Sequence, residues 1–291
     1  MPGSPSARAR KRALFAVVAL AMSGLLAPAR SLAAPAAWIA KTEPIRIMAL
    51  GDSITAGVGP NGRDVDGDGG YRGELERLLE AGGYRFVMTG TRTDYSERIA
   101  ARAHEGWPGY VLRSLPSAPG HELVGPVTAR AIRTYEPDVV LLMAGTNDLL
   151  RLQKGAAGYT IPEIVDGMDA LLAQIVALEP HVHVIVAGVV QSPKISACAV
   201  AAFDGAERAG CEPAGDDAPS LRSLVARYRT AGYDVSFAPG MSAAVPRDGE
   251  HFPDGIHPTG AGGYAAIARV WMRAIESETL PGPGGVADAR D

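Results

Sequence analysis

Short apolar runs alternate with longer amphipathic stretches along the chain from residue 45 onward. Runs dominated by Val, Ile and Leu predict five strands, at residues 45–50, 85–88, 139–143, 182–190 and 235–237. Apolar residues at spacings of three and four predict five helices, at residues 73–81, 123–135, 162–178, 221–231 and 262–277. Near-continuous apolar strands that alternate with helices are typical of a parallel sheet covered on both faces. The pattern therefore predicts an α/β fold with a five-stranded parallel sheet.

The alternating pattern fills residues 41–280 without an interdomain linker or an internal repeat. A sheet of this kind occupies about 200 to 250 residues, so this stretch predicts a single domain. Residues 281–291 carry Pro, Gly and charge with no apolar period, and we expect a disordered tail there.

The first 34 residues differ from the rest of the chain. A basic cluster at residues 8–12 precedes a nearly unbroken apolar run at 13–27 and the small residues of Ser31-Leu32-Ala33. This order is typical of a cleaved secretory signal peptide. The alternative is a retained membrane anchor, but about 15 apolar residues fall short of the roughly 20 that span a bilayer. We therefore predict a secreted protein without stable membrane insertion.

Charge and cysteine content bear on the environment and the partners of the mature protein. Beyond residue 34 the chain has 23 basic residues against 32 acidic ones, which leaves a charge of −9. An acidic body lacks the positive surface that binds phosphate backbones, so nucleic acid is not an expected partner. The two cysteines are Cys198 and Cys211. In an oxidising compartment they predict one disulfide that closes a surface loop, with two free thiols as the alternative.

Residues capable of chemistry follow three of the predicted strands. Ser53 comes after the first strand, where it can be a nucleophile or a helix N-cap. Asn147 comes after the third, where its amide can donate hydrogen bonds or form an Asx-turn. Asp254 and His257 come after the fifth, at a spacing that lets the carboxylate orient the imidazole as a general base. Strand ends of a parallel sheet meet at one edge, so we expect these side chains to share a crevice.

These blocks together resemble the GDSL or SGNH hydrolases. Gly51-Asp52-Ser53 matches the first block of that family, Gly145-Thr146-Asn147-Asp148 the G-x-N-D block, and Asp254-Gly255-Ile256-His257 the D-x-x-H block. Ile54 stands where the name of the family has Leu. The resemblance implies a three-layer, flavodoxin-like α/β/α sandwich. It also implies a serine esterase in which Ser53 attacks, His257 accepts the proton and Asp254 fixes the imidazole.

The resemblance further implies an oxyanion hole made by the backbone N–H of Ser53, the Asn147 amide and a glycine N–H. The segment at residues 104–110 offers Gly109 and Gly106 for that third donor, and the family pattern favours Gly109. No cofactor or metal is implied for this chemistry.

Two segments, at residues 69–72 and 104–109, are similar to carbohydrate esterase family 3, which consists of secreted acetyl xylan esterases. This similarity implies acetyl or short-acyl esters, on a polysaccharide or a small molecule, as substrates. Tyr71, Trp107 and Tyr110 are candidates for stacking on sugar rings, although aromatic residues beside a glycine turn also pack into scaffolds.

Other functions are compatible with parts of the pattern. A lipase or phospholipase of the same fold is one alternative, and a non-catalytic carbohydrate-binding relative is another, which the complete set of catalytic residue types disfavours. Asp64, Asp66 and Asp68 alternate as in the opening of a calcium loop, but Leu75 stands where the bidentate Glu belongs, and a solvated acidic turn is the alternative. The sequence does not determine the oligomeric state.

Overall fold

The strands of the structure form a parallel sheet whose order brings the ends of β1 and β4 together. The structure is a computed structural model and describes residues 43–62, 67–114, 121–212, 215 and 217–279. Within these residues the strands are β1 (Ile45–Gly51), β2 (Phe86–Thr89), β3 (Glu105–Gly106), β4 (Val139–Met143), β5 (His183–Ala187) and β6 (Val235–Ala238). Their order is β2-β1-β4-β5-β6, and β3 pairs with β1 beyond the end of β2. Without β3, this is the 2-1-3-4-5 order of flavodoxin-like sheets, which bind ligands where the order reverses.

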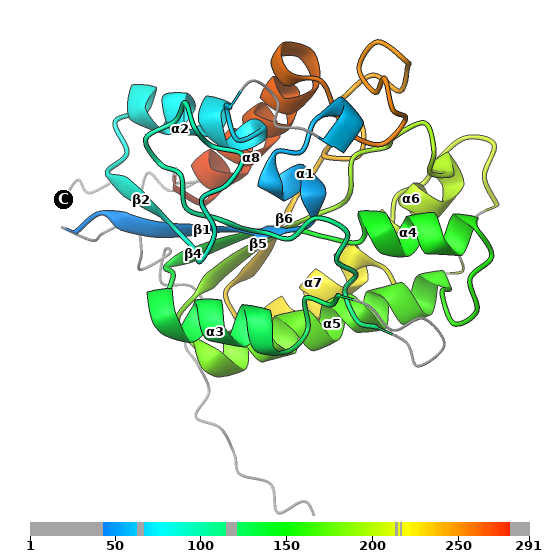
Figure 1. Ribbon diagram of the computed structural model, residues 1–291. Helices are drawn as coiled ribbons and strands as arrows, with labels where there is room; N and C mark the ends of the chain where they lie inside the picture. Colours follow the sequence, from blue (N-terminus) through cyan, green and yellow to red (C-terminus); the bar gives the residue numbers. More distant parts are fainter. Residues whose placement is uncertain (1–42, 63–66, 115–120, 213–214, 216, 280–291) are drawn as a thin grey trace, which may run out of the picture. The chain divides into compact units, whose positions relative to one another are not determined.

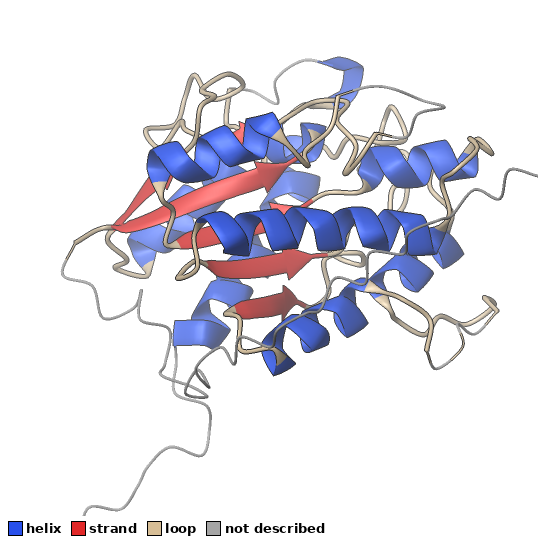
Figure 2. Cartoon of the chain, turned by 90° about the horizontal axis from the view of Figure 1, so that it is seen from below, coloured by secondary structure: helices blue, strands red, loops and turns tan. Residues whose placement is uncertain are grey.

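Helices cover both faces of the sheet (Figures 1 and 2). They are α1 (Ser53–Ala56), α2 (Tyr71–Ala81), α3 (Pro126–Tyr135), α4 (Thr146–Gln153), α5 (Ile161–Leu178), α6 (Ala197–Asp204), α7 (Leu221–Thr230) and α8 (Ala265–Thr279), with a 3-10 turn at Pro60–Gly62 and a π-helical turn at Gly260–Tyr264. In Figure 1, α2 and α8 lie above the sheet, and α3, α5 and α7 lie below it. The three-layer α/β/α sandwich is therefore confirmed.

Alternate residues of the central strands supply the two cores. On β4, Val140 and Leu142 join the cluster under α3, α5 and α7, whereas Val139, Leu141 and Met143 join the cluster under α2 and α8. A strand with apolar side chains on both faces must be covered on both sides, which explains the continuous apolar runs of the sequence.

The observed elements differ from the predicted ones mainly where elements are short. The strand predicted at residues 182–190 ends at Ala187, because the last residue pair with β6 is Ala187–Ala238. The chain then leaves the sheet, and the N–H of Gln191 bonds to Ser242 in the loop after β6. The two-residue strand β3 and the short helices α1, α4 and α6 were not predicted, because each is too short to show a period.

Several predictions concern residues that the structure does not describe. The proposed signal peptide at residues 1–34, the tail at 281–291, and Asp64 and Asp66 all lie outside the described residues. Among the described residues, no helix is long and apolar enough to cross a membrane. Cys198 and Cys211 are joined in a disulfide, with their Cα atoms 5.4 Å apart.

Candidate active site

Ser53 is the first residue of α1, directly after the sharp turn that ends β1. Asp52 caps this helix, because its Oδ1 accepts the N–H of Ile54 at 3.0 Å. Gly51 allows β1 to lie close to β4, since a Cβ there would be 2.1 Å from the carbonyl oxygen of Met143. The helix ends at Gly57, which has a left-handed φ of +91°. This tight strand–helix connection places the Ser53 side chain at the end of the sheet.

The imidazole of His257 bridges Ser53 and Asp254. Its Nε2 lies 2.9 Å from Ser53 Oγ, across 204 residues of sequence, and its Nδ1 lies 2.7 Å from Asp254 Oδ2. Asp254 Oδ1 accepts the N–H groups of Ile256 and His257, each at 2.8 Å. Burial acts to raise the pKa of Asp254, but the hydrogen bonds from the His257 side chain and from these N–H groups lower it below its usual value. The carboxylate is thus ionised and orients the imidazole toward the hydroxyl.

Sequence reasoning missed a second Asp-x-x-His pair, Asp248 and His251. Asp248 Oδ1 accepts the His251 N–H at 2.9 Å and lies 2.8 Å from its Nδ1, so the local geometry resembles that of Asp254 and His257. The outer edge of the His251 ring, however, lies beside Gly262, because its Cδ2 and Nε2 are 3.1 and 3.3 Å from the position that a Cβ on that glycine would take. The two pairs therefore differ in what the outer ring nitrogen faces, and it is His257 that meets Ser53.

Asn147 lies in the first turn of α4, after the left-handed Gly145, whose φ is +117°. Its amide Nδ2 donates to the carbonyl oxygen of Tyr110 at 2.8 Å. An amide nitrogen has two N–H groups, so one donor of Asn147 remains for a ligand. The next residue, Asp148, holds the same neighbouring segment, because both of its carboxylate oxygens accept the N–H of Leu112, at 3.2 and 3.1 Å. The G-x-N-D block therefore ties α4 to the chain just after Gly109.

Two carboxyl groups are buried behind Ser53 and Asn147. Asp52 is fully buried, and burial raises its pKa. Burial likewise raises the pKa of Asp148 to about 7, and the charge of Asp52 acts in the same direction. Asp52 caps α1 through Oδ1, and Asp148 holds the backbone at Leu112, so each carboxyl group fixes a backbone segment beside Ser53 or Asn147.

The structure separates the two glycines that the sequence left as alternatives. The Gly106 N–H donates to His104 Nδ1 at 3.0 Å, and a Cβ on Gly106 would lie 2.2 Å from the backbone nitrogen of Ala56. Gly106 thus lets β3 pack against α1, and its N–H is already used. Gly109 is exposed, has a φ of +79°, and its N–H makes no hydrogen bond to the described residues. Gly109 is therefore the better candidate for an oxyanion donor.

The turn that carries Gly109 is fixed by buried polar side chains. His104 is fully buried, and burial, with the charge of Arg72, lowers its pKa to about 3, so it is neutral. Its Nε2 lies 3.0 Å from the carbonyl oxygen of Asp94. The buried Glu105 accepts the indole N–H of Trp107 at 2.9 Å and the N–H of Thr91. These contacts tie the turn to the backbone at Thr91 and Asp94.

The aromatic residues that the sequence singled out divide into two groups. Tyr71 is fully buried and packs 6.1 Å from Trp271, centroid to centroid, so the expectation that it could stack on a sugar is wrong. Trp107 and Tyr110 are half-buried, with ring centroids 5.1 Å apart. The guanidinium of Arg92 lies 4.7 Å from the Trp107 ring. The Trp107 ring therefore contacts both the Tyr110 ring and the Arg92 guanidinium, and the two aromatic residues flank Gly109 in the sequence.

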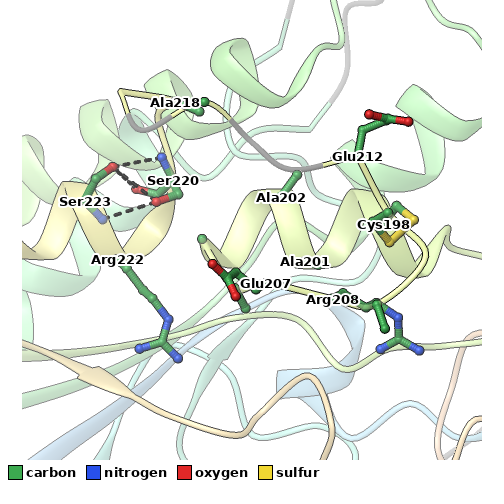
Figure 3. Close-up of a pocket in the computed structure, with 15 residues that line it drawn as sticks. Cys198, Ala201, Ala202, Glu207, Arg208, Glu212, Ala218, Ser220, Arg222 and Ser223 are labelled. Carbon is green, nitrogen blue, oxygen red and sulfur yellow. Dashed lines mark hydrogen bonds between the residues drawn. A yellow bond between two sulfur atoms is a disulfide. The ribbon is translucent and has the colours of Figure 1, made fainter.

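One cavity among the described residues does not include Ser53 in its lining. It has a volume of about 920 Å³ and lies between α6, the disulfide and the start of α7 (Figure 3). Acidic and basic side chains, among them Glu207, Arg208 and Arg222, line it together. The described residues contain no group of three or more His, Cys, Asp or Glu side chains that could hold a metal ion.

Comparisons with known proteins agree with this geometry. Residues 49–265 match the model of the GDSL-like lipase/acylhydrolase family. A family 3 carbohydrate esterase of Clostridium thermocellum has a similar structure, with a TM-score of 0.60 and 25% identity, over 81% of this chain and 98% of that one. One from Talaromyces cellulolyticus, 21% identical with a TM-score of 0.60, covers 80% of this chain and 97% of its own and shows the shared fold.

A multidomain esterase of Ruminococcus flavefaciens is 32% identical over 123 residues, which cover 36% of this chain and 14% of that protein. The family match extends over most of the described elements and includes Ser53 and Asn147 as well as Asp254 and His257. The chain therefore belongs to the GDSL-like lipase/acylhydrolase family, a family of carboxylic ester hydrolases.

Proposed function

We propose that this protein is a secreted serine esterase that removes acetyl or other short acyl groups from carbohydrate. The observation that carries the proposal is the continuous chain of contacts from Asp254 through His257 to Ser53, at 2.7 and 2.9 Å. The carbohydrate part is supported by the similarity to the C. thermocellum family 3 carbohydrate esterase. Secretion is supported by the signal-like pattern of residues 1–34, and the disulfide suits an oxidising compartment.

In the proposed reaction, Ser53 Oγ attacks the carbonyl carbon of the ester while His257 Nε2 takes the hydroxyl proton. Asp254 stabilises the imidazolium that results. Collapse of the tetrahedral intermediate breaks the bond to the alcohol, which leaves with the proton from His257 and so forms an acyl-enzyme. Water, deprotonated by His257, then hydrolyses the acyl-enzyme, which releases the carboxylic acid and restores Ser53.

The negative charge on the carbonyl oxygen would be stabilised by three N–H donors. These are the backbone N–H of Ser53 at the start of α1, the N–H of Gly109 and the second amide N–H of Asn147. Because the Asn147 amide bonds to the carbonyl oxygen of Tyr110, next to Gly109, two of these donors are held relative to each other before substrate binds, and such preorganisation favours strong transition-state stabilisation.

A chain-length series of p-nitrophenyl esters, followed by assay of acetate release from acetylated xylan, tests the substrate class. We expect high activity on the acetate ester, low activity on the octanoate ester, and acetate release from the polysaccharide. A preference for octanoate would instead identify a lipase-type acyl hydrolase.

The two Asp-x-x-His pairs provide a matched control for the catalytic assignment. Ser53→Ala and His257→Ala should each abolish turnover, whereas His251→Ala should leave it near the parent value, because His251 faces Gly262. Equal loss in both histidine variants would contradict the assignment.

The N-terminal sequence of protein recovered from the culture medium tests secretion, and a start near residue 35 is expected.

A further inference from the structure

The helix that carries Ser53 is too short to satisfy its own carbonyl groups. The carbonyl oxygen of Ser53 accepts the N–H groups of Gly57 and Val58, and that of Ile54 also accepts the N–H of Gly57. The carbonyl oxygens of Thr55 and Ala56 receive their hydrogen bonds from outside the helix and its following turn. Buried carbonyl groups require a partner, so the donor at this end fixes how α1 lies.

That donor is the side chain of Arg72. Its Nε donates to the carbonyl oxygen of Thr55 at 3.1 Å, and its Nη2 donates to that of Ala56 at 2.9 Å. Nη2 also donates to Ser96 Oγ at 2.9 Å, and Nη1 donates to the carbonyl oxygen of Arg102 at 3.1 Å. The planar guanidinium thus binds two adjacent carbonyl groups of α1 and anchors them to a separate loop, which a single ammonium group cannot reproduce.

The position of Arg72 is costly for a cation. The residue is 2% exposed, and burial of a charge carries a large desolvation penalty even after the protein relaxes. It is also the second residue of α2, where the positive end of the helix dipole disfavours a cation. A residue whose burial and whose position in the helix are both unfavourable for stability is expected to contribute to a functional site.

The backbone before Arg72 packs directly against the end of α1. A Cβ on Gly57 would lie 2.4 Å from the carbonyl carbon of Gly69, and one on Gly70 would lie 2.7 Å from the Cα of Gly57. The start of α2 and the end of α1 are therefore in direct backbone contact, and the Arg72 guanidinium bridges them.

We propose that Arg72 is a positioning residue for Ser53. By holding the last two carbonyl groups of α1, it fixes the helix whose first residue supplies both the nucleophilic Oγ and one N–H of the oxyanion hole. A tilt of α1 would move Oγ away from His257 Nε2 and would move the N–H away from the developing oxyanion. Misplacement by about 1 Å at such a site can cost about 100-fold in rate.

The inference rests on the proposed function, and kinetics of Arg72→Lys and Arg72→Met on p-nitrophenyl acetate test it. We expect kcat to fall by about 10- to 100-fold at temperatures where circular dichroism shows a folded protein, with KM changed less than about twofold. Lysine retains the charge without the fork, so it should not restore kcat. A purely structural role would lower the unfolding temperature and leave kcat of the folded protein unchanged. That outcome would overturn the inference.

Two further variants keep the test decisive. Ser96→Ala removes one acceptor of the guanidinium, and it should lower kcat by about two- to tenfold with little effect on KM. If the Arg72 variants do not fold, an unchanged kcat in Ser96→Ala overturns the inference. Tyr228→Phe is the control for stability alone, because its hydroxyl bonds to Asp169 on the opposite face of the sheet.

Activity that survives Ser53→Ala would refute the proposed function itself, whereas loss in Ser53→Ala with full activity in Arg72→Lys would refute only the role of Arg72.

Discussion

Replacement of Asp204 by Asn should stabilise the protein at neutral and alkaline pH. Asp204 is the last residue of α6, is 4% exposed, and its Oδ1 has no hydrogen-bond partner among the described residues. This oxygen lies 2.0 Å from the position that a Cβ on Gly188 would take, so the carboxyl group is pressed against the backbone after β5. Burial raises the pKa of Asp204 from 3.8 to about 7, although a hydrogen bond with Ser242 and the charge of Arg222 act in the opposite direction.

The sign of the effect follows from proton linkage. The pKa of Asp204 is higher in the folded state than in the unfolded state, so its protonated form contributes stability that is fully present below pH 3.8 and is lost as the pH rises to about 7. Each pH unit in this window lowers the free energy of unfolding by up to about 1.4 kcal/mol. Asparagine has nearly the same shape and does not titrate, so the Asp204→Asn variant should be free of this loss.

Urea unfolding of the parent and of Asp204→Asn at about pH 5 and about pH 8 measures the difference. The stability gained through the substitution should be larger at the higher pH by about 2 to 3 kcal/mol. Asp166→Asn, on the exposed side of α5, is the matched control and should show no such change. A gain from Asp204→Asn that is the same at both pH values would refute the reasoning that the buried carboxyl carries a desolvation penalty.

Three further predictions concern the site and its surroundings. Asn147→Ala should reduce kcat by about 10² to 10³ without loss of fold, and near-full turnover would remove Asn147 from the oxyanion hole. Gly106→Ala should lower the free energy of unfolding by about 1 to 3 kcal/mol, because its Cβ would overlap the backbone of Ala56. A Cβ on Gly109 meets nothing within 4 Å, so Gly109→Ala should cost only the strain of its left-handed φ of +79°, about 1 to 2 kcal/mol. Cys198→Ser should cost about 3 kcal/mol in urea unfolding under oxidising conditions, and an unchanged midpoint would contradict a stabilising bridge.

The features that the sequence predicted in agreement with the structure depend on patterns among neighbouring residues. Nearly continuous apolar runs marked β1 and β4, because strands buried on both faces consist mostly of apolar residues, with Arg46 near the start of β1 as the exception. Because parallel strands end at the same edge of a sheet, the prediction could also place Ser53 and Asn147, which follow these strands, at that edge. Features decided by distant contacts could not be predicted. The N–H of Gly106 is unavailable because the buried imidazole of His104 accepts it, and that contact depends on the strand β3, which is two residues long.

The two Asp-x-x-His pairs show most clearly where local reasoning ends. In both, a carboxylate three residues upstream accepts the backbone N–H of the histidine and contacts Nδ1, so the same spacing orients the imidazole in each case. What differs is the group that Nε2 meets. The ring of His251 faces a glycine of the π-helical turn that precedes α8, whereas that of His257 reaches the first residue of α1. That distinction is set by the packing of α8 and α2 on the same face of the sheet as α1, a property of the whole fold. The role of general base that we propose for His257 therefore depends on two separate conditions. A short-range contact orients the ring, and a long-range contact brings Ser53 Oγ to Nε2. Only the first can be read from the spacing of residues.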